Sequence, residues 1–400
     1  MKENELKLIF FNQVAGPLFR ELADDLSKVF HPSFLYTGHK DTILHYKADH
    51  FLKIKAGPVY NRKNIILRIF SWLHYFLAAF FESVWVPSGS LLVLATNPPF
   101  LGLLGIFWKL TRKQKYIILI YDISPEDLIE SGFLKEGLLA KIWRFFNSFV
   151  FKNADLIFTI SSDMEYYLGN RYGLVKRKNP ALIYIPPWAD VDAIKPIRKS
   201  DNWFIDNHNL KGKIVLLYSG NMGYSHDIEA ILAAAVKLAD EHGLHFLFCG
   251  EGAKRGLIEN TKKEKGLKNI TLLPFLPADT YPYCLAAADI GIVSYKTGME
   301  NFMIPSKSCY YMAAGLALLV ISGEENDIAR LTREHNCGMH IKNTDIEGMK
   351  LAILKMAGDP GLLEGYKKAS RDAAVRFYSR KNTQLYINAI RNLSSFRGPA

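Results

Sequence analysis

The stretch Tyr218–Gly243, YSGNMGYSHDIEAILAAAVKLADEHG, joins a strand to a helix through a turn that contains two glycines. The strand is expected over Ile214–Tyr218, and the helix is expected to begin near Ser225. The helix has one apolar face, because apolar residues recur at helical spacing: Ile228, Ile231, Leu232, Ala235 and Leu238. A buried strand followed at once by an amphipathic helix predicts one unit of a parallel α/β sheet.

Short apolar runs alternate with helical patterns along the rest of the chain, in two series. The first series of expected strands comprises Lys7–Phe11, Leu91–Thr96, Tyr116–Tyr121, Leu156–Ile160 and Ala181–Ile185. The second series comprises Ile214–Tyr218, His245–Cys249, Ile270–Leu273, Ile290–Ser294 and Ala317–Ile321. Four hundred residues with 49% hydrophobic content are enough for two cores. The chain is therefore predicted to form two Rossmann-like α/β domains.

The join between the domains is expected at PPWADVDAIKP, Pro186–Pro196, which has three prolines and no periodicity. We predict an N-terminal domain over residues 1–188 and a C-terminal domain over residues 189–378. The last segment, residues 379–400, is expected to form a helix that packs back on the N-terminal domain. Ligands of such sheets bind outside the carboxyl ends of the strands, so candidate residues are sought in the loops that follow strands.

The turn after the strand Ile214–Tyr218 is a candidate anion site. Gly220 and Gly223 would let the backbone approach a ligand closely. The N–H groups of the helix start, expected at Gly223–His226, would favour a pyrophosphate. The alternative is an ordinary strand–helix turn in which glycine supplies a positive φ.

Two further motifs follow predicted strands. CGEGAKRGLIE, Cys249–Glu259, carries two glycines and then a basic pair. In MENFMIPSKSCYYMAAGLALLVI, Met299–Ile321, the Glu300 carboxylate could hold sugar hydroxyls, and Lys307 near a helix start could neutralise phosphate. The alternative for both is a solvated loop and helix start.

The order of these motifs resembles the retaining family 4 glycosyltransferases with the GT-B fold. The resemblance rests on GNMGYSHD, FCGEG, LLPFLPADTYPYCLAAADIGIVSY and PSKSCYYMAAG in the second half, and on LATNPPFLGLLG, YDISPED and PPWADVDAIKP before them. It is strongest with members that act in capsule, O-antigen and exopolysaccharide assembly. The resemblance implies two Rossmann-like domains that face each other across a cleft, a UDP-sugar in the C-terminal domain, no metal or other cofactor, and retention at the anomeric carbon.

The resemblance also implies a set of donor-binding positions: Gly220, Asn221, Gly223, His226, Gly250, Glu251, Leu276, Ser306 and Tyr310. Many family members have arginine and lysine around the first glycine loop, where this chain has Asn221 and His226. Phosphate neutralisation would then shift to Lys307, to the helix dipole, and to His226 in its protonated form.

Many members also carry two glutamates with seven residues between them, the second taken as the ribose ligand. Aligning MAAG places Phe302 and Tyr310 at these two positions. Glu300 is the nearest acid and is the candidate for the first glutamate. Ser306 or a backbone group would take over the ribose contact.

In the N-terminal domain, Asp122 follows a predicted strand and could act as a base or positioner for the acceptor hydroxyl. The alternative is that Asp122 caps the turn before Pro125. Gly16, after the first strand, resembles the family's glycine loop and is the candidate for acceptor binding. Asp190 and Asp192 form a DxD in the join and are interpreted as structural. With no CxxC pair and no metal spacing among the histidines, no metal site is predicted.

The net charge of +11 is concentrated in one part of the chain. The stretch between His50 and Tyr121 contains nine Lys or Arg and one acid, Glu82, so its net charge is 9 − 1 = +8. This part also holds IILRIFSWLHYFLAAFFESVW, with Phe70, Trp72, Tyr75, Phe76, Phe80, Phe81 and Trp85. Cations beside aromatic residues are typical of a surface that lies on anionic lipid, and a core helix is the alternative. No recognition motif for nucleic acid accompanies the charge.

These observations predict a cytoplasmic enzyme, peripheral on the inner face of the plasma membrane, that moves a sugar from a nucleotide-sugar to a glycan or lipid-linked acceptor. The N-terminus MKENELKLIFF has acids where a signal peptide would be basic. Two alternatives are a nucleotide-sugar epimerase of the same fold and a non-catalytic partner subunit.

Overall fold

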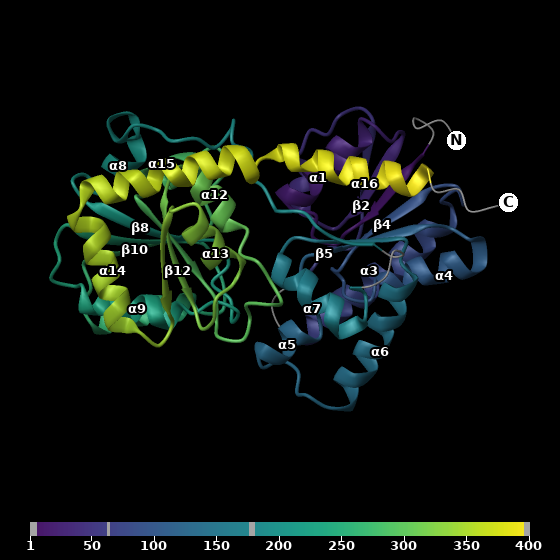
Figure 1. Cartoon of the computed structure of the whole chain (residues 1–400), viewed down its shortest axis with the longest axis horizontal. Helices are drawn as coiled ribbons and strands as arrows, with labels where there is room; N and C mark the ends of the chain where they lie inside the picture. The colour runs from purple at the N-terminus through teal and green to yellow at the C-terminus, as the bar shows by residue number, and fades with distance from the viewer. Residues whose placement is uncertain (1–5, 62–64, 176–180, 396–400) are drawn as a thin grey trace. The chain divides into compact units, whose positions relative to one another are not determined.

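The computed structural model describes residues 6–61, 65–175 and 181–395, and these residues divide into two compact units (Figure 1). The N-terminal unit runs to Pro186 and takes up the chain again from Lys381. The C-terminal unit is Pro187–Arg380. Each unit is a parallel sheet covered by helices, as the alternation of apolar runs predicts.

The N-terminal unit contains a seven-stranded parallel sheet in the order β3-β2-β1-β4-β5-β6-β7. Its strands are β1 Leu8–Phe11, β2 Ser33–Thr37, β3 Leu52–Ala56, β4 Leu91–Ala95, β5 Tyr116–Ile120, β6 Leu156–Thr159 and β7 Ala181–Tyr184. The central strands β1, β4, β5 and β6 are buried along their whole length because helices cover both faces.

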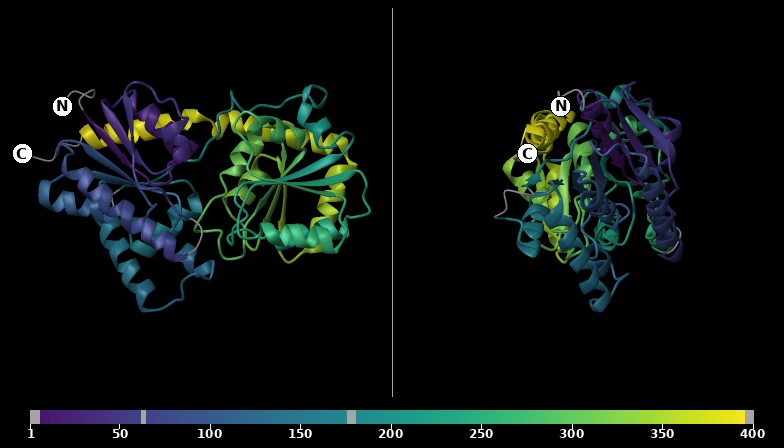
Figure 2. Two further views of the ribbon diagram at one scale, coloured as in Figure 1. Left: turned by 180° about the vertical axis from the view of Figure 1, so that it is seen from behind. Right: turned by 90° about the vertical axis from the view of Figure 1, so that its right-hand side faces the viewer.

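Helices cover the two faces of this sheet as separate layers (Figures 1 and 2). One layer contains α3 Ile65–Val84, α4 Gly102–Arg112, α6 Leu138–Asn153 and α7 Ser162–Tyr172. On the other face α1 Pro17–Ser27 contacts α16 Thr383–Ser395, the last helix of the chain. Two short helices, α2 Lys40–Leu44 and α5 Glu126–Glu130, lie in loops.

The C-terminal unit contains a six-stranded parallel sheet in the order β10-β9-β8-β11-β12-β13. Its strands are β8 Ile214–Ser219, β9 Leu244–Cys249, β10 Ile270–Leu273, β11 Ile290–Ser294, β12 Ala317–Ser322 and β13 Gly338–Lys342. Its helices are α8 Trp203–Asn207, α9 Ile228–Lys237, α10 Arg255–Glu264, α11 Tyr281–Ala287, α12 Lys307–Ala313, α13 Asp327–Glu334, α14 Ile346–Gly358 and α15 Pro360–Phe377. From β8 the chain adds β9 and β10 on one side of the sheet and then β11, β12 and β13 on the other, so the strand order reverses between β8 and β11. These two strands pair with Leu216 opposite Ile290. Loops diverge at such a switch point and leave room for a ligand.

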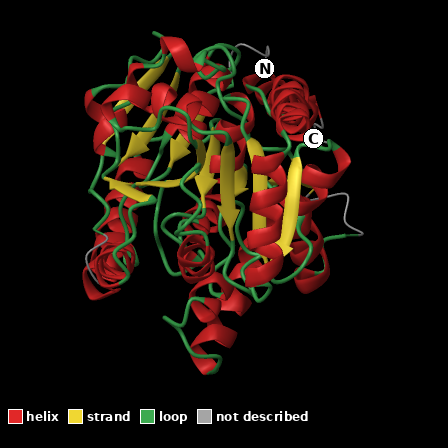
Figure 3. Cartoon of the chain, turned by 90° about the vertical axis from the view of Figure 1, so that its left-hand side faces the viewer, coloured by secondary structure: helices red, strands yellow, loops and turns green. Residues whose placement is uncertain are grey.

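Within the described residues, the ten strands expected from the sequence are confirmed with ends that differ by at most one residue, and three strands were missed. The missed β3 and β13 are edge strands whose residues are mostly half-buried or exposed, so they carry no continuous apolar run. The missed β2, SFLYT, is short and contains only two aromatic residues and one leucine. Figure 3 shows the strands as a layer between helices. Among the described helices, none combines the length and the apolar character needed to cross a membrane.

Candidate functional site

The turn after β8 is held in place by hydroxyl groups from other elements. The Ser219 N–H donates to the Tyr311 hydroxyl at 2.7 Å, and the Ser219 and Tyr281 hydroxyls lie 2.8 Å apart. The Tyr218 hydroxyl donates to the carbonyl of Asn221 at 2.8 Å. These bonds connect the turn to α11 and α12, which follow it by 60 residues or more in the sequence.

Two glycines of this region are required by backbone geometry. Gly220 has φ 112° and Gly250 has φ 145°, values that favour glycine. A Cβ on Gly250 would lie 1.9 Å from the Gly220 carbonyl oxygen, because the loops after β8 and β9 touch. The expectation of a positive φ at Gly223 is wrong, and a Cβ there would meet only the side chain of Asn221.

The first turn of α9 differs from the sequence prediction. The helix begins at Ile228, and the Asp227 side chain caps it by accepting a hydrogen bond from the Ala230 N–H at 2.9 Å. The expectation of helix N–H groups at Gly223–His226 is therefore wrong. The Asp227 carboxylate already lies at the N-terminus of α9, so its negative charge offsets the positive end of the helix dipole.

Lys307 brings an ammonium group to the Gly220 turn from α12. The residue is 9% exposed, and its Nζ lies 3.6 Å from the centre of the Tyr218 ring. Within the described part of the chain, Nζ has no hydrogen-bond partner. Burial lowers the pKa of Lys307 well below its ordinary value. A buried amine that lacks a hydrogen-bond partner is a candidate binding site for an anion or another acceptor.

His226 cannot help to neutralise phosphate in a protonated form, as the sequence suggested. Its Nδ1 lies 2.7 Å from the Ser294 carbonyl oxygen, which can only accept, so Nδ1 carries the proton. Burial, followed by repulsion from Lys307, lowers the pKa of His226 to about 3. The ring is therefore neutral at pH 7, and its Nε2 accepts rather than donates.

Glu300 lies in the loop after β11 and is buried. Its carboxylate accepts hydrogen bonds from the backbone N–H groups of Gly298 at 2.7 Å, Gly323 at 2.8 Å and Glu324 at 3.3 Å. These bonds tie the loop after β11 to the loop after β12. A role for Glu300 toward sugar hydroxyls stays a prediction.

The basic pair Lys254-Arg255 supports the loops around β9. The Lys254 ammonium donates to the His226 carbonyl at 2.7 Å and to Glu229 at 2.6 Å. Arg255 donates to the carbonyls of Gly250 at 2.8 Å and Leu273 at 3.1 Å. Both cations already have partners, unlike Lys307.

The other predicted donor-binding residues follow strands of the same sheet. Asn221 and Glu251 are exposed after β8 and β9, and Leu276 is half-buried after β10. Ser306 is exposed at the start of α12. Tyr310 is half-buried, with its ring 6.1 Å from that of Tyr281. The parallel sheet thus brings these residues to its carboxyl edge.

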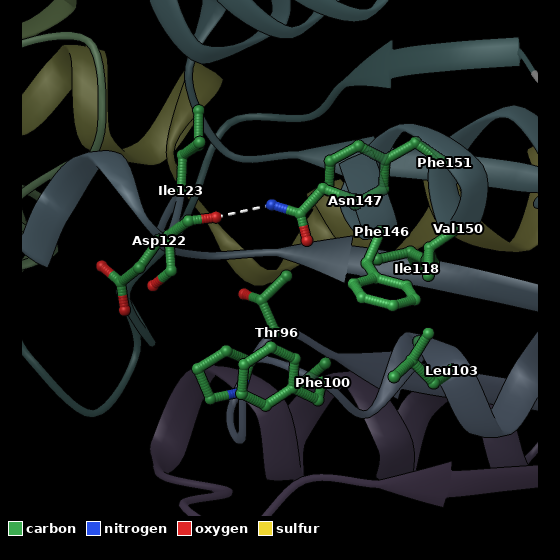
Figure 4. A pocket seen from close by; sticks show the side chains of 14 residues that line it. Thr96, Phe100, Leu103, Ile118, Asp122, Ile123, Phe146, Asn147, Val150 and Phe151 are labelled. Atoms are coloured by element: carbon green, nitrogen blue, oxygen red, sulfur yellow. Dashed lines mark hydrogen bonds between the residues drawn. The ribbon is translucent and has the colours of Figure 1, made fainter. Parts of the chain in front are cut away.

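In the N-terminal unit, Asp122 follows β5 and borders a small pocket (Figure 4). The cavity is about 20 Å³, room for one water molecule. Its polar wall includes Thr96, Ser124 and Asn147, and the Asn147 amide donates to the Ser124 carbonyl at 2.6 Å. Asp122 is exposed, and α5 has no side-chain cap, so the interpretation of Asp122 as a cap is wrong.

Asp127, which the sequence did not single out, lies in the same YDISPED motif. Its Oδ1 is buried and without a hydrogen-bond partner among the described residues. Burial, followed by repulsion from Asp122, raises the pKa of Asp127 to about 7. The signal available in the sequence was a second acid five residues after Asp122, the candidate base.

Gly16 and the DxD pair have local structural roles. Gly16 precedes α1 after the end of β1, and its N–H donates to the Val14 carbonyl at 2.7 Å. Asp190 closes a turn by accepting from the N–H groups of Asp192 and Ala193 at 3.0 and 2.9 Å. No group of three or more His, Cys, Asp or Glu side chains in the described ranges could hold a metal ion.

The helix layer of the N-terminal unit has a large apolar surface. More than half of the exposed large apolar side chains among the described residues lie between Ile66 and Phe149. Of the aromatic residues expected on this surface, Phe70, Phe81 and Trp85 are exposed, whereas Trp72 and Tyr75 are buried. Arg62 and Lys63 lie outside the described residues.

The family described as glycosyl transferases group 1 matches residues 200–373. These residues are a glycosyltransferase group 1 domain. The group 1 domain covers most of the C-terminal unit and includes the Gly220 turn and Lys307. The family resemblance seen in the motifs is confirmed.

Two curated bacterial proteins resemble the chain beyond the group 1 domain. A probable glycosyltransferase, WbjE of Pseudomonas aeruginosa, is 30% identical over 264 residues, which are 64% of this chain and 63% of WbjE. A putative colanic acid biosynthesis glycosyl transferase, WcaI of Escherichia coli K12, is 25% identical over 282 residues, 69% of this chain and 67% of WcaI. The matched part of the chain thus spans less than two thirds of WbjE.

Solved structures share the fold of both units. Sucrose-phosphate synthase from Thermosynechococcus elongatus has a TM-score of 0.78 at 15% identity, covering 98% of this chain and all of that one. Anabaena HepE in complex with UDP-glucose has a TM-score of 0.74 at 12% identity, covering 98% and 100%. These likenesses confirm the predicted GT-B fold.

Proposed function

We propose that the chain transfers a sugar from a UDP-sugar to a glycan or polyprenyl-linked acceptor during assembly of a bacterial surface polysaccharide, with retention at the anomeric carbon. The group 1 domain and the resemblance to WbjE and WcaI support glycosyl transfer in such a pathway. HepE, a structural relative, binds UDP-glucose, which supports a UDP-sugar as the donor here.

The observation that carries the proposal is the buried Lys307 amine beside the Gly220 turn. When the bond between the anomeric carbon and the β-phosphate oxygen breaks, the electron pair stays on the departing diphosphate. Negative charge then grows on its oxygens. The Lys307 ammonium, in a site of low dielectric, stabilises this charge more strongly than an exposed lysine would.

We propose Lys307, rather than a divalent metal ion or His226, as the cation that faces the diphosphate. His226 is neutral and protonated on Nδ1, and Lys254 and Arg255 are held by the protein's own acceptors. Chelation by EDTA should therefore leave turnover unchanged. A loss of activity on chelation, restored by Mg²⁺ or Mn²⁺, would contradict this part of the proposal.

The acceptor is proposed to bind in the N-terminal unit, near Gly16 and Asp122. The exposed Asp122 carboxylate would position the attacking hydroxyl or accept its proton. Asp127, with its pKa raised to about 7, can carry a proton at neutral pH and so can share this task with Asp122.

Ligand-induced thermal shift tests the donor assignment. UDP should raise the Tm of the wild-type chain more than GDP, ADP or dTDP does, since a ligand stabilises the state that binds it. Lys307→Met should lose most of the shift. Lys237→Met is the matched control, because Lys237 is an exposed lysine paired with Glu347 far along the chain. An unchanged UDP shift in Lys307→Met would remove Lys307 from the donor site.

Turnover separates the proposed activity from its alternatives. With a panel of UDP-sugars and acceptors, a transferase releases UDP and extends the acceptor. An epimerase interconverts the sugars without net release of UDP. A non-catalytic partner subunit does neither.

The membrane partner is proposed to be the anionic cytoplasmic leaflet, where a polyprenyl-linked acceptor presents its sugar. The exposed cations Lys113 and Lys115 at the end of α4 add to this attraction. Sedimentation with anionic vesicles should show binding that weakens as salt rises. A chain that stays in the supernatant at low salt would contradict the membrane partner and leave the donor site untouched.

A further inference from the structure

The outward face of α6 is apolar along its length. Leu138, Leu139 and Phe145 are 72%, 70% and 68% exposed. The remaining exposed apolar residues of this face are Ile142, Phe146 and Phe149. Successive positions 138, 142, 145 and 149 lie on one side of a helix, so these side chains form a continuous stripe. The opposite side is anchored in the unit by buried Ala140, Val150 and Phe151.

The outward face of α3 has the same character. Its exposed apolar residues are Ile66, Leu67, Ile69, Phe70, Leu73, Leu77 and Phe81. Its inner face packs on the sheet through Trp72, Tyr75 and Ala79, which are 9% exposed or less. The inner faces of α3 and α6 thus supply the buried contacts, and the outer stripes stay largely exposed.

Contacts connect α3, α4 and α6 into one surface. The Trp108 indole N–H of α4 donates to the Ser83 hydroxyl of α3 at 2.7 Å. The Arg68 guanidinium of α3 lies 5.5 Å from the ring centre of Phe133, which precedes α6. Phe100, which precedes α4, lies 4.6 Å from Trp143 of α6, measured between ring centres. We name α3, α4 and α6 together the apolar layer (Figure 2).

The charged residues of the apolar layer are mostly basic, although acids outside the layer pair with two of them: Asp155 with Lys109 at 2.9 Å, and Glu126 and Glu136 with Arg144 at 2.9 and 2.6 Å. Its three helices contain six basic residues and one acid, Glu82. That acid is bonded to Lys55 at 2.6 Å. The basic residues are Arg68, Lys109, Arg112, Lys141, Arg144 and Lys152. A second copy of the same layer would bring like charges together, whereas an anionic lipid surface complements both the charge and the apolar stripes.

We propose that α6, together with α3, inserts its apolar face into the hydrocarbon boundary of an anionic phospholipid bilayer. The inference rests on the membrane partner proposed above and adds the element that enters the lipid. Helices of this kind lie in the membrane plane with the apolar face buried by about 5–10 Å. Binding then has an apolar component that salt does not screen.

Site-specific labelling in the full-length chain tests the proposal directly. The four native cysteines are buried, so an exposed introduced cysteine can be labelled selectively. An environment-sensitive fluorophore on Phe145→Cys and on Phe70→Cys should shift to shorter wavelength when phosphatidylcholine–phosphatidylglycerol vesicles are added. Lipids brominated in the acyl chain should quench both labels. The control is Leu351→Cys in α14, because Leu351 is 64% exposed in the C-terminal unit and should not respond.

Vesicle binding by a second pair of variants measures the apolar component. Phe145→Gln/Phe149→Gln should lower the vesicle-bound fraction about tenfold or more at high salt, since two phenyl groups lose their burial in lipid. Leu351→Gln should bind as the wild type does.

Each other outcome overturns the inference in a recognisable way. If the label at position 70 responds and that at 145 does not, the docking surface excludes α6. If the label at 145 is shielded before vesicles are added and the chain is dimeric, a second copy covers α6. If the wild type binds no vesicles, the inference and the membrane partner both fail, whereas the UDP thermal shift still reports on the donor site.

Discussion

Lys307 and His226 are both buried basic groups, but the structure gives them opposite electrostatic roles. Each has a lowered pKa, and burial is the first cause in both. His226 has a carbonyl partner for its one proton, which stabilises the neutral ring. Among the described residues, the Lys307 amine has only the face of the Tyr218 ring beside it, which favours the charged form but satisfies no N–H group. Lys307 is therefore the residue whose state an anionic ligand should change most.

Replacing Lys307 by alanine should lower turnover by about 10²–10³-fold, the usual effect of losing one preorganised electrostatic partner. The fold should stay intact, because the amine has no hydrogen bond to lose. Steady-state release of UDP measures the effect, and Lys237→Ala is the control. A turnover near that of the wild type would assign the leaving-group charge to another residue.

UDP affinity should fall as the pH rises through the lowered pKa of free Lys307. Free Lys307 loses its proton below the ordinary lysine pKa of 10.5, and a bound diphosphate favours the charged amine again. Binding therefore takes up a proton once the pH exceeds the free-state pKa, so affinity declines through that range. Calorimetric titration in buffers of different ionisation enthalpy should detect the proton. Lys307→Met should bind weakly at every pH, and a pH-dependent decline that persists in it would contradict the assignment.

His226 should make the chain sensitive to acid. Its pKa is about 3 in the folded state and 6.5 in the unfolded reference, so the unfolded chain binds more protons between these values. Its contribution to the free energy of unfolding is complete above pH 6.5 and is lost as the pH falls toward 3. The difference of 3.5 units corresponds to at most about 5 kcal/mol. Urea unfolding of the wild type and of His226→Asn, compared between pH 7 and pH 4, should show a shallower decline in the variant.

Among the elements, the loops after β8 and β9 depend on each other through two glycines. Gly250→Ala should destabilise this pair, because φ is 145° and the new Cβ would meet the Gly220 carbonyl oxygen. We expect a loss of about 1–3 kcal/mol in the free energy of unfolding and a loss of UDP binding. Gly256→Ala is the matched control and should retain both, because nothing lies within 4 Å of a Cβ at that position. Equal effects of the two substitutions would show that the strain is not local to Gly250.

The N-terminal unit is built from two separate segments of the chain, because α16 returns to it after the C-terminal unit is complete. Tyr386 and Ile390 of α16 are 1% exposed, and the Tyr386 ring lies 4.6 Å from that of Phe158, measured between ring centres. A chain ending at Arg380 should therefore lose several kcal/mol from the N-terminal unit, at roughly 1.5–3 kcal/mol for each large apolar side chain.

The C-terminal unit of this shortened chain should be unaffected, and its UDP thermal shift should persist. Limited proteolysis should then cut first within the N-terminal unit. Loss of the UDP shift on the same truncation would mean that the donor site depends on α16.

The sequence by itself determined the two parallel sheets, because a buried strand and an amphipathic helix are each visible as a local period. It also indicated the glycosyltransferase group 1 domain, since the motifs around Gly220, Gly250 and Lys307 keep their order along the chain. It did not show which residues carry the charge. Asp227 caps α9 through the nearby Ala230 N–H. Glu300 ties two loops together and His226 is neutral, because Gly323 and Ser294 fold beside them from more distant segments.

Only the tertiary structure decided the rest. Gly220 and Lys307 are 87 positions apart, and nothing in the sequence between them predicts that they meet. In the structure, a Cβ built on Gly220 would lie 3.9 Å from the Lys307 Nζ. Apolar residues at helical spacing likewise predict a buried face, whether or not anything covers it. In α6 the stripe from Leu138 to Phe149 faces outward, because Ala140, Val150 and Phe151 already fill the inner side. Periodicity records which residues share a face, and packing alone decides which face is covered.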